Sequence, residues 1–175
     1  MRQSENIYLI GLMGAGKTTI GRQLAKALKI PFYDTDKAIE ENTGVDILTI
    51  FEFEGEDGFR DREQKMIGQL TQMQGIVLAT GGGAILREAN RLLLKERGFV
   101  VYLQCAVARI LERTRRDTQR PLLKVNDRRE RLEKLLAERE QYYLDCADFT
   151  IDTGILQSKV VVKRILEQYQ AEIQQ

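Results

Sequence analysis

A glycine-rich segment at residues 11–18, with the sequence GLMGAGKT, joins a wholly apolar run to an amphipathic stretch. The run Ile7–Ile10 predicts a buried strand, because consecutive apolar residues leave no face for water. Residues 18–28 place Ile20, Leu24 and Leu28 at helical spacing, which predicts a helix with one apolar face. A buried strand that turns through a tight glycine loop into a helix favours α/β architectures.

The rest of the chain repeats this alternation of short apolar runs and longer amphipathic stretches. Strands are predicted at 32–34, 76–79, 99–103 and 149–151. Helices are predicted within 37–74, with turns near Gly44 and Gly55, at 88–97, from about 106, at 127–145 and at 158–173. Short apolar strands separated by helices are typical of a parallel sheet covered on both faces. We therefore expect one domain over residues 1–175, with a three-layer, doubly wound α/β fold of about five parallel strands.

The composition excludes several kinds of chemistry. The chain has no histidine, which removes Ser-His-Asp and Cys-His mechanisms and zinc sites that need imidazole. Its 27 Lys and Arg residues nearly balance its 26 Asp and Glu residues, so no strong overall charge favours nucleic acid. Cys105 and Cys146 lie beside apolar residues and are expected to be buried free thiols. No segment resembles a secretion signal or a membrane span, so we expect a cytoplasmic protein.

Residues 11–18 also fit the pattern G-x-x-x-x-G-K-[ST], in the strand, loop and helix context that this motif requires. Glycines let such a loop point successive N–H groups at phosphate oxygens, and the helix N-terminus adds positive charge. Lys17 would reach the β- and γ-phosphates, and Thr18 would ligate Mg²⁺. The sequence therefore predicts a nucleoside triphosphate with magnesium, bound by Gly14, Ala15, Gly16, Lys17, Thr18 and Thr19.

Two other nucleotide-binding classes lack their characteristic motifs here. GTPases need N-K-x-D and D-x-x-G, and neither string occurs in the chain. A motor or transporter ATPase would end a hydrophobic strand in Asp or Asp-Glu, whereas the run at 76–79 is followed by Thr80 and three glycines. Small phosphotransferases remain.

Six motifs, taken in order over about residues 6–153, resemble those of the shikimate kinase family. They are GLMGAGKT at 11–18, DTD at 34–36, Phe59-Arg60-x-x-Glu63, the glycines at 81–83, RPLL at 120–123, and Arg139 with Tyr143. The resemblance implies a P-loop kinase fold with a mobile lid at about 112–125 and a substrate-binding helical region at about 37–74. It also implies an enzyme that uses ATP to phosphorylate the 3-hydroxyl of shikimate in aromatic amino acid (chorismate) biosynthesis. ATP and shikimate would be its partners and Mg²⁺ its cofactor.

Two aspartates follow the second predicted strand, at the edge of the sheet where ligands bind. Asp34 and Asp36 are two residues apart, so an extended backbone would turn them the same way. The resemblance implies that Asp36 contacts the reacting hydroxyl and takes its proton, while Asp34 holds Mg²⁺ through water. The alternative interpretation is a strand-end turn followed by a helix N-cap, since Asp36 precedes a predicted helix.

Two arginines are the expected clamp for the substrate carboxylate, because a guanidinium meets a carboxylate with two parallel bonds. Arg139 lies on an otherwise apolar helix face and needs an anion, for which an internal salt bridge is the alternative. The resemblance gives Arg60 the same role and has Glu63 orient it. The alternative for these two residues is an exposed i,i+3 ion pair.

The resemblance assigns roles to four further residues. Gly82 would present its N–H to the substrate, although the glycine run could simply end a strand. Arg120 would close over ATP with the lid and join Lys17 and Asp36 as a catalytic residue, stabilising charge on the transferring phosphoryl group. Arg113 would flank the adenine, and Gln157 belongs to an adenine wall expected at 153–157.

Three competing hypotheses stay open. Another small-molecule kinase of this fold, such as a gluconate or nucleoside monophosphate kinase, would share the nucleotide loop. A non-catalytic ATP-binding module would bind nucleotide without turnover. A nucleic-acid binder could use the basic stretch at 113–131, but that stretch has no interleaved aromatic residue for base stacking. We expect a monomeric enzyme with no nucleic-acid or membrane partner.

Overall fold

A five-stranded sheet forms the centre of the structure, a computed structural model that describes residues 6–115 and 127–174. The strands are β1 (Ile7–Ile10), β2 (Phe32–Asp34), β3 (Val77–Ala79), β4 (Phe99–Gln104) and β5 (Phe149–Asp152). The helices are α1 (Lys17–Leu28), α2 (Thr35–Thr43), α3 (Ile47–Leu70), the 3₁₀ helix η1 (Ala84–Leu86), α4 (Glu88–Arg97), α5 (Val107–Thr114), α6 (Arg128–Cys146) and α7 (Ser158–Ile173).

The strands run in the order β2-β3-β1-β4-β5, and every neighbouring pair is parallel. Strand β1 is central, with Ile7 opposite Val77 of β3 on one side and Phe99 of β4 on the other. The chain leaves β1 toward one edge of the sheet and leaves β4 toward the other. Ligands of doubly wound folds bind beyond the carboxyl ends of such strands, which is where the loop after β1 lies.

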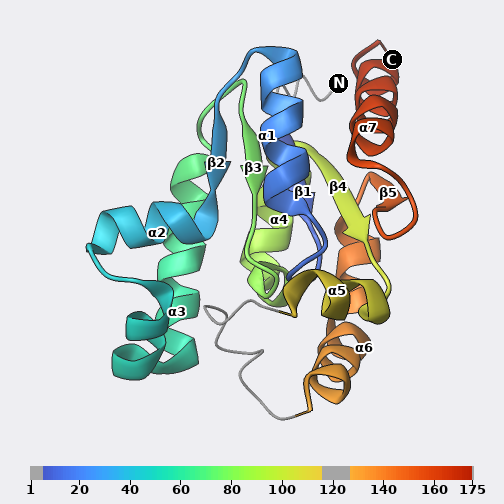
Figure 1. The fold of residues 1–175 in the computed structure, drawn as a ribbon. Helices are drawn as coiled ribbons and strands as arrows, with labels where there is room; N and C mark the ends of the chain where they lie inside the picture. Colours follow the sequence, from blue (N-terminus) through green and yellow to red (C-terminus); the bar gives the residue numbers. More distant parts are fainter. Residues whose placement is uncertain (1–5, 116–126, 175) are drawn as a thin grey trace.

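Helices cover both faces of the sheet (Figure 1). Helices α1 and α7 pack together on one face, and α4 and α6 lie on the other. Helices α2 and α3 pack together beyond the β2 edge, and α5 crosses the carboxyl end of the sheet (Figure 1). These layers confirm the predicted α/β fold.

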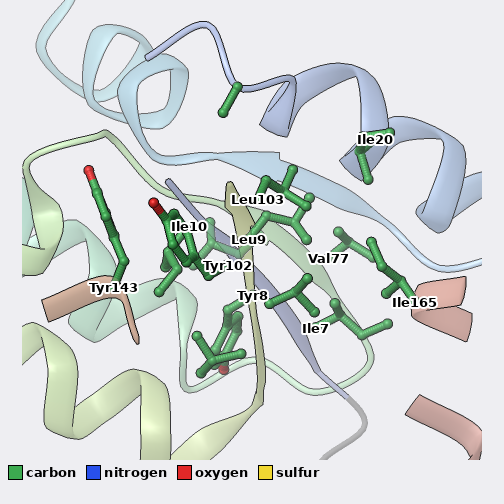
Figure 2. Close-up of a cluster of buried hydrophobic side chains, with 14 of the residues drawn as sticks. Ile7, Tyr8, Leu9, Ile10, Ile20, Val77, Tyr102, Leu103, Tyr143 and Ile165 are labelled. Atoms are coloured by element: carbon green, nitrogen blue, oxygen red, sulfur yellow. The ribbon is translucent and has the colours of Figure 1, made fainter. Parts of the chain in front are cut away.

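The main core consists of the strands and the inner faces of the helices (Figure 2). Leu9 and Leu103 point toward Ile20 of α1, whereas Tyr102 points the other way and stacks on Tyr143 of α6 with ring centroids 4.9 Å apart. This alternation follows from the two-residue repeat of a strand. Each such side chain contributes about 1.5–3 kcal/mol by leaving water, so the sheet fixes the strand ends firmly.

A second, smaller cluster lies under α2 and α3. Its buried members are Ile39, Ile50 and Phe59, and Met66 packs against both this cluster and the main core. Between its parts, α3 is interrupted at Gly55, whose φ of 70° and ψ of −175° are not helical. The turns predicted near Gly44 and Gly55 are therefore confirmed.

Some predicted boundaries were wrong. Helix α2 begins at Thr35 rather than 37, because the Asp34 side chain caps it. The backbone at Asp36 is therefore helical, and the two aspartates do not share an extended strand. Helix α3 ends at Leu70 rather than 74. Cys105 and Cys146 are buried free thiols, as predicted.

The predicted lid overlaps the described structure only in part. Residues 112–114 end α5, whereas 116–125 lie outside the described residues. Within residues 6–115 and 127–174, no helix is both long and apolar enough to cross a membrane.

Candidate active site

Residues 11–16 form the loop that joins β1 to α1. Gly16 caps α1 in the left-handed region at φ 100°, which directs the first N–H groups of the helix toward the loop. The Lys17 Nζ donates to the carbonyl oxygens of Gly11 and Leu12, at 2.5 and 3.0 Å. The ammonium group is thus held over the loop, where phosphate oxygens would lie.

Thr18 and Asp34 join the nucleotide loop to the start of α2. The Thr18 hydroxyl donates to Asp34 Oδ2 at 3.1 Å. The other oxygen, Oδ1, accepts from the backbone N–H groups of Asp36 and Lys37 at 3.0 and 3.3 Å. Asp34 is therefore a helix N-cap, and the same carboxylate also points an oxygen at Thr18.

This pair of oxygens fits a magnesium ion. In the described ranges, no group of three or more Cys, Asp or Glu side chains could hold a metal by itself. Mg²⁺ commonly takes one or two protein oxygens and completes its shell with phosphates and water. The Thr18 hydroxyl and the Asp34 carboxylate provide that number beside the phosphate loop.

Asp36 lies in the first turn of α2 and faces the pocket. Its Oδ1 is buried and has no hydrogen-bond partner among the described residues. Burial and the carboxylates of Glu63 and Asp34 raise the pKa of Asp36 to about 7, against the opposing effect of Lys17 and Arg60. A carboxyl group that titrates near neutrality can accept a proton from a substrate hydroxyl.

Arg60 and Glu63 form a buried pair in α3. The Arg60 Nη1 donates to Glu63 Oε1 at 2.8 Å, and the exposed fractions of the two residues are 6% and 0%. The alternative of an exposed surface pair is therefore wrong. The Arg60 Nε and the Glu63 Oε2 have no partner among the described residues, so both side chains keep capacity for a ligand or water. Burial raises the pKa of Glu63, although Arg60 opposes that shift.

The three glycines after β3 pass close to these side chains. A Cβ on Gly81 would lie 2.6 Å from Glu63 Oε2 and 3.0 Å from Asp36 Oδ1. Gly83 faces the Arg60 guanidinium in the same way. The run ends a strand, and it also leaves space for the buried charges of α2 and α3.

Arg139 reaches the same place from α6. It is 2% exposed, and its Nε and Nη1 have no hydrogen-bond partner among the described residues. The internal salt bridge that the sequence left open is not present within those residues. The Nη1 lies 3.6 Å from the position of a Cβ on Gly82, and the Tyr143 hydroxyl donates to the Gly82 carbonyl oxygen at 2.5 Å.

These side chains line one open pocket of about 170 Å³. Lys17 and Thr18 border it on the nucleotide side, with Asp34, Asp36, Arg60, Glu63, Gly82 and Arg139 around it. Sequence analysis missed its apolar wall, which consists of Met13, Ile47, Phe51 and Phe59. The sequence predicted helices within residues 37–74, but nothing local indicated which of their apolar side chains border this cavity.

A second pocket of about 230 Å³ lies on the other side of the loop. It is lined by Ala15, Gly16, Thr19, Ile20, Arg113, Thr153, Leu156, Ser158 and Val161. The Arg113 Nη2 donates to the Thr153 carbonyl oxygen at 2.5 Å, and its Nη1 donates to the Ala15 carbonyl oxygen at 3.3 Å. Gln157 is exposed and does not line this pocket, whereas its neighbours do.

Two residues hold the elements on this side together: Thr153, which lies within the adenine wall predicted at 153–157, and Arg128, for which no role was predicted. The Thr153 hydroxyl donates to the Ala15 carbonyl oxygen at 2.6 Å, which fixes the nucleotide loop to the end of β5. Arg128 donates to the carbonyl oxygen and the hydroxyl of Thr114, joining the start of α6 to the end of α5. Arg120 lies outside the described residues.

Comparison with known proteins decides the family. The family model for shikimate kinase matches residues 13–170. The chain belongs to the shikimate kinase family. The shikimate kinase of Methylococcus capsulatus is 53% identical over 97% of this chain and 95% of its own. The shikimate kinase of Thioalkalivibrio sulfidiphilus is 56% identical over 97% of this chain and 89% of its own.

A solved shikimate kinase shares the fold almost throughout. The enzyme from Acinetobacter baumannii, solved in complex with shikimate, superposes with a TM-score of 0.94 at 46% identity, covering 98% of this chain and 96% of its own. The shikimate kinase family membership makes the chain a kinase, as predicted, and removes the non-catalytic module from consideration.

Proposed function

We propose that the chain transfers the γ-phosphoryl group of ATP to the 3-hydroxyl of shikimate, and that the residues of the first pocket bind and activate shikimate. One observation carries this assignment of the site. Two guanidinium groups and two carboxylates, each with a buried polar atom that lacks a partner among the described residues, face one pocket beside the nucleotide loop. Buried polar atoms of this kind are unfavourable unless a ligand satisfies them.

Arg139 and Arg60 would bind the shikimate carboxylate. Each has a buried N–H donor without a partner, and Glu63 holds the Arg60 guanidinium in place. The apolar wall of Phe51 and Phe59 suits the carbon face of a ring.

Asp36 would take the proton of the attacking hydroxyl. Its unpaired Oδ1 and its pKa of about 7 both suit this role. The Gly82 N–H would contact the substrate from the opposite wall. Lys17 would hold the γ-phosphate in line, and we keep Arg120 as the lid residue that stabilises its charge.

Thr18 and Asp34 would hold the divalent ion, for which we propose Mg²⁺. When bound, such an ion neutralises charge on the β- and γ-phosphates. Gly14 to Thr19 would cradle the phosphates, and the second pocket would take the adenine against Ile20 and Leu156. Arg113 would border that base, whereas the position of Gln157 gives it no support as a contact.

Coupled measurement of ADP release tests the proposal. With ATP and Mg²⁺, shikimate should give turnover, while gluconate and nucleoside monophosphates should give at least a hundredfold less. Lys17→Ala should abolish that turnover and remain folded by circular dichroism. Equal turnover with gluconate, or full activity of Lys17→Ala, would contradict the proposal. A monomeric state, a cytoplasmic location and the absence of a nucleic-acid partner stay predictions.

A further inference from the structure

Arg62 reaches back across the interruption of α3 to Glu54. Its Nε and Nη2 donate to the two carboxylate oxygens of Glu54, at 2.7 and 2.6 Å. Two parallel bonds between a guanidinium and a carboxylate are stronger and more directional than a single contact. Between the partners, Gly55 adopts a backbone conformation that is essentially restricted to glycine. The ion pair therefore bridges the residue at which the helical backbone of α3 is interrupted.

The pair joins two parts of α3 with different tasks. Residues 46–54, here called the flap, present Ile47 and Phe51 to the first pocket. The part after Gly55 carries Arg60 and Glu63. The position of the flap relative to that second part therefore sets the distance across the pocket from Ile47 and Phe51 to Arg60.

Beside this ion pair, the flap packs on the small cluster rather than on the main core. The Phe51 ring lies 4.8 Å from the Phe59 ring, and Ile50 belongs to the small cluster rather than the main core. At the other end, the Ile47 N–H donates to Glu40 Oε2 at 3.3 Å. On the outer side, Phe53 is 85% exposed. A segment that packs outside the main core can open locally without unfolding the domain.

We propose that the Glu54–Arg62 pair is a latch that holds the flap against the first pocket and so makes both residues positioning residues for acceptor binding. The inference rests on the proposed function, in which shikimate occupies that pocket. Half-exposed ion pairs contribute little to global stability. Here the pair acts on one weakly attached segment, so its loss changes the affinity for the acceptor more than the melting temperature.

Two single variants, the double variant that combines them and a matched control test the latch. Glu54→Gln and Arg62→Gln should each raise the KM for shikimate about three- to fivefold, with the KM for ATP and kcat changed less than twofold. The double variant should be no worse than either single variant, because both remove one shared interaction. Glu52→Gln is the control. Glu52 lies on the same flap and is exposed, and its side chain has no hydrogen bond or ion pair within the described residues, so the Glu52→Gln variant should have the KM of the unaltered protein.

A charge swap separates a latch from a general effect of lost charge. Glu54→Arg combined with Arg62→Glu should bring the KM for shikimate back within about twofold of the unaltered protein. Hydrogen exchange gives an independent measurement, since the amides of residues 47–54 should exchange faster in Glu54→Gln than in Glu52→Gln. If Glu54→Gln does not fold, the same exchange comparison of the unaltered protein in low and high salt replaces it, with faster flap exchange expected in high salt.

The outcomes distinguish this inference from the proposed function. If the unaltered protein releases no ADP with shikimate, the proposed function fails and the latch fails with it. If the unaltered protein is active but Glu54→Gln has the KM of Glu52→Gln, only the latch is overturned. The latch is also overturned if the amides of residues 47–54 exchange at an unchanged rate when the ion pair is removed or when the salt concentration is raised.

Discussion

The hydroxyl of Tyr143 donates a hydrogen bond to the carbonyl oxygen of Gly82. Tyr143 follows Arg139 by one turn of α6, so a single helix holds the loop after β3 and presents a guanidinium beside it. Tyr143 is buried against Tyr102, and burial raises the pKa of its hydroxyl to about 12. The phenol therefore remains a neutral donor throughout the physiological range.

Tyr143→Phe should weaken acceptor binding by loosening the Gly82 loop. The substitution removes one buried hydrogen bond and leaves a carbonyl oxygen without its partner, which costs about 1–3 kcal/mol of stability. The KM for shikimate should rise about three- to tenfold while the KM for ATP is unchanged. Steady-state kinetics and thermal melting check both effects. Tyr142→Phe is the control, because Tyr142 lies at the surface and should change neither quantity.

Arg139→Lys and Arg139→Ala should both raise the KM for shikimate, by about ten- to a hundredfold. Lysine keeps the charge but cannot form two parallel bonds to a carboxylate, so it should recover only part of the affinity. Calorimetric titration with shikimate measures the loss directly. An Arg139→Ala variant that binds shikimate normally would remove Arg139 from the clamp.

Asp36→Asn should lower turnover about a hundredfold or more and make the protein more stable at pH 8. The folded-state pKa of Asp36, about 7, lies above the ordinary value of 3.8. A group whose pKa is raised by folding makes its full contribution to the free energy of unfolding below its unfolded-state pKa. That contribution is lost as the pH rises through the folded-state pKa. The ionised carboxylate therefore destabilises the fold at pH 8, and asparagine removes that charge.

Asp36→Asn should stabilise the protein more at pH 8 than at pH 5. At pH 5 the buried Asp36 carboxyl group is mostly protonated, so the folded state does not yet carry the full free-energy cost of its ionisation. Melting temperatures of the variant and the unaltered protein at both values provide the measurement. A variant that is less stable at both pH values would show that Asp36 supports the fold instead of straining it.

Gly81→Ala should disturb the site, because its Cβ would lie 2.6 Å from the buried oxygen Oε2 of Glu63. We expect a loss of about 1–3 kcal/mol in stability and a strong loss of kcat/KM for shikimate. Gly68→Ala is the matched control. It lies within α3 with no atom within 4 Å of an added Cβ, so it should be neutral or stabilise the helix by about 0.5–1 kcal/mol.

Local sequence patterns were sufficient to predict the strands of the sheet and the glycine-rich loop. Every strand of the described residues was predicted from a short apolar run, and the glycine loop from its motif. A helix N-cap at Asp36 was an open alternative, but the structure places the cap at Asp34, and the same carboxylate also accepts a hydrogen bond from Thr18.

Contacts between distant segments could not be predicted in this way. The closeness of Gly81 to Glu63, and of Thr153 to Ala15, depends on how α3 and β5 pack against the loops, and no local spacing encodes that packing. The Arg113 guanidinium donates hydrogen bonds to the backbone carbonyl oxygens of Ala15 and Thr153, and no sequence pattern predicts these contacts. Gln157 was placed in the adenine wall by position alone, and the structure turns it outward.

The small cluster of Ile39, Ile50 and Phe59 has a consequence for how such a chain can change over time. Because it is separate from the main core, with Met66 packing against both, substitutions there can reshape the acceptor wall while the sheet and the nucleotide loop keep their packing. An acceptor region with its own core makes new acceptor preferences accessible through few mutations, without first destabilising the part that binds phosphate.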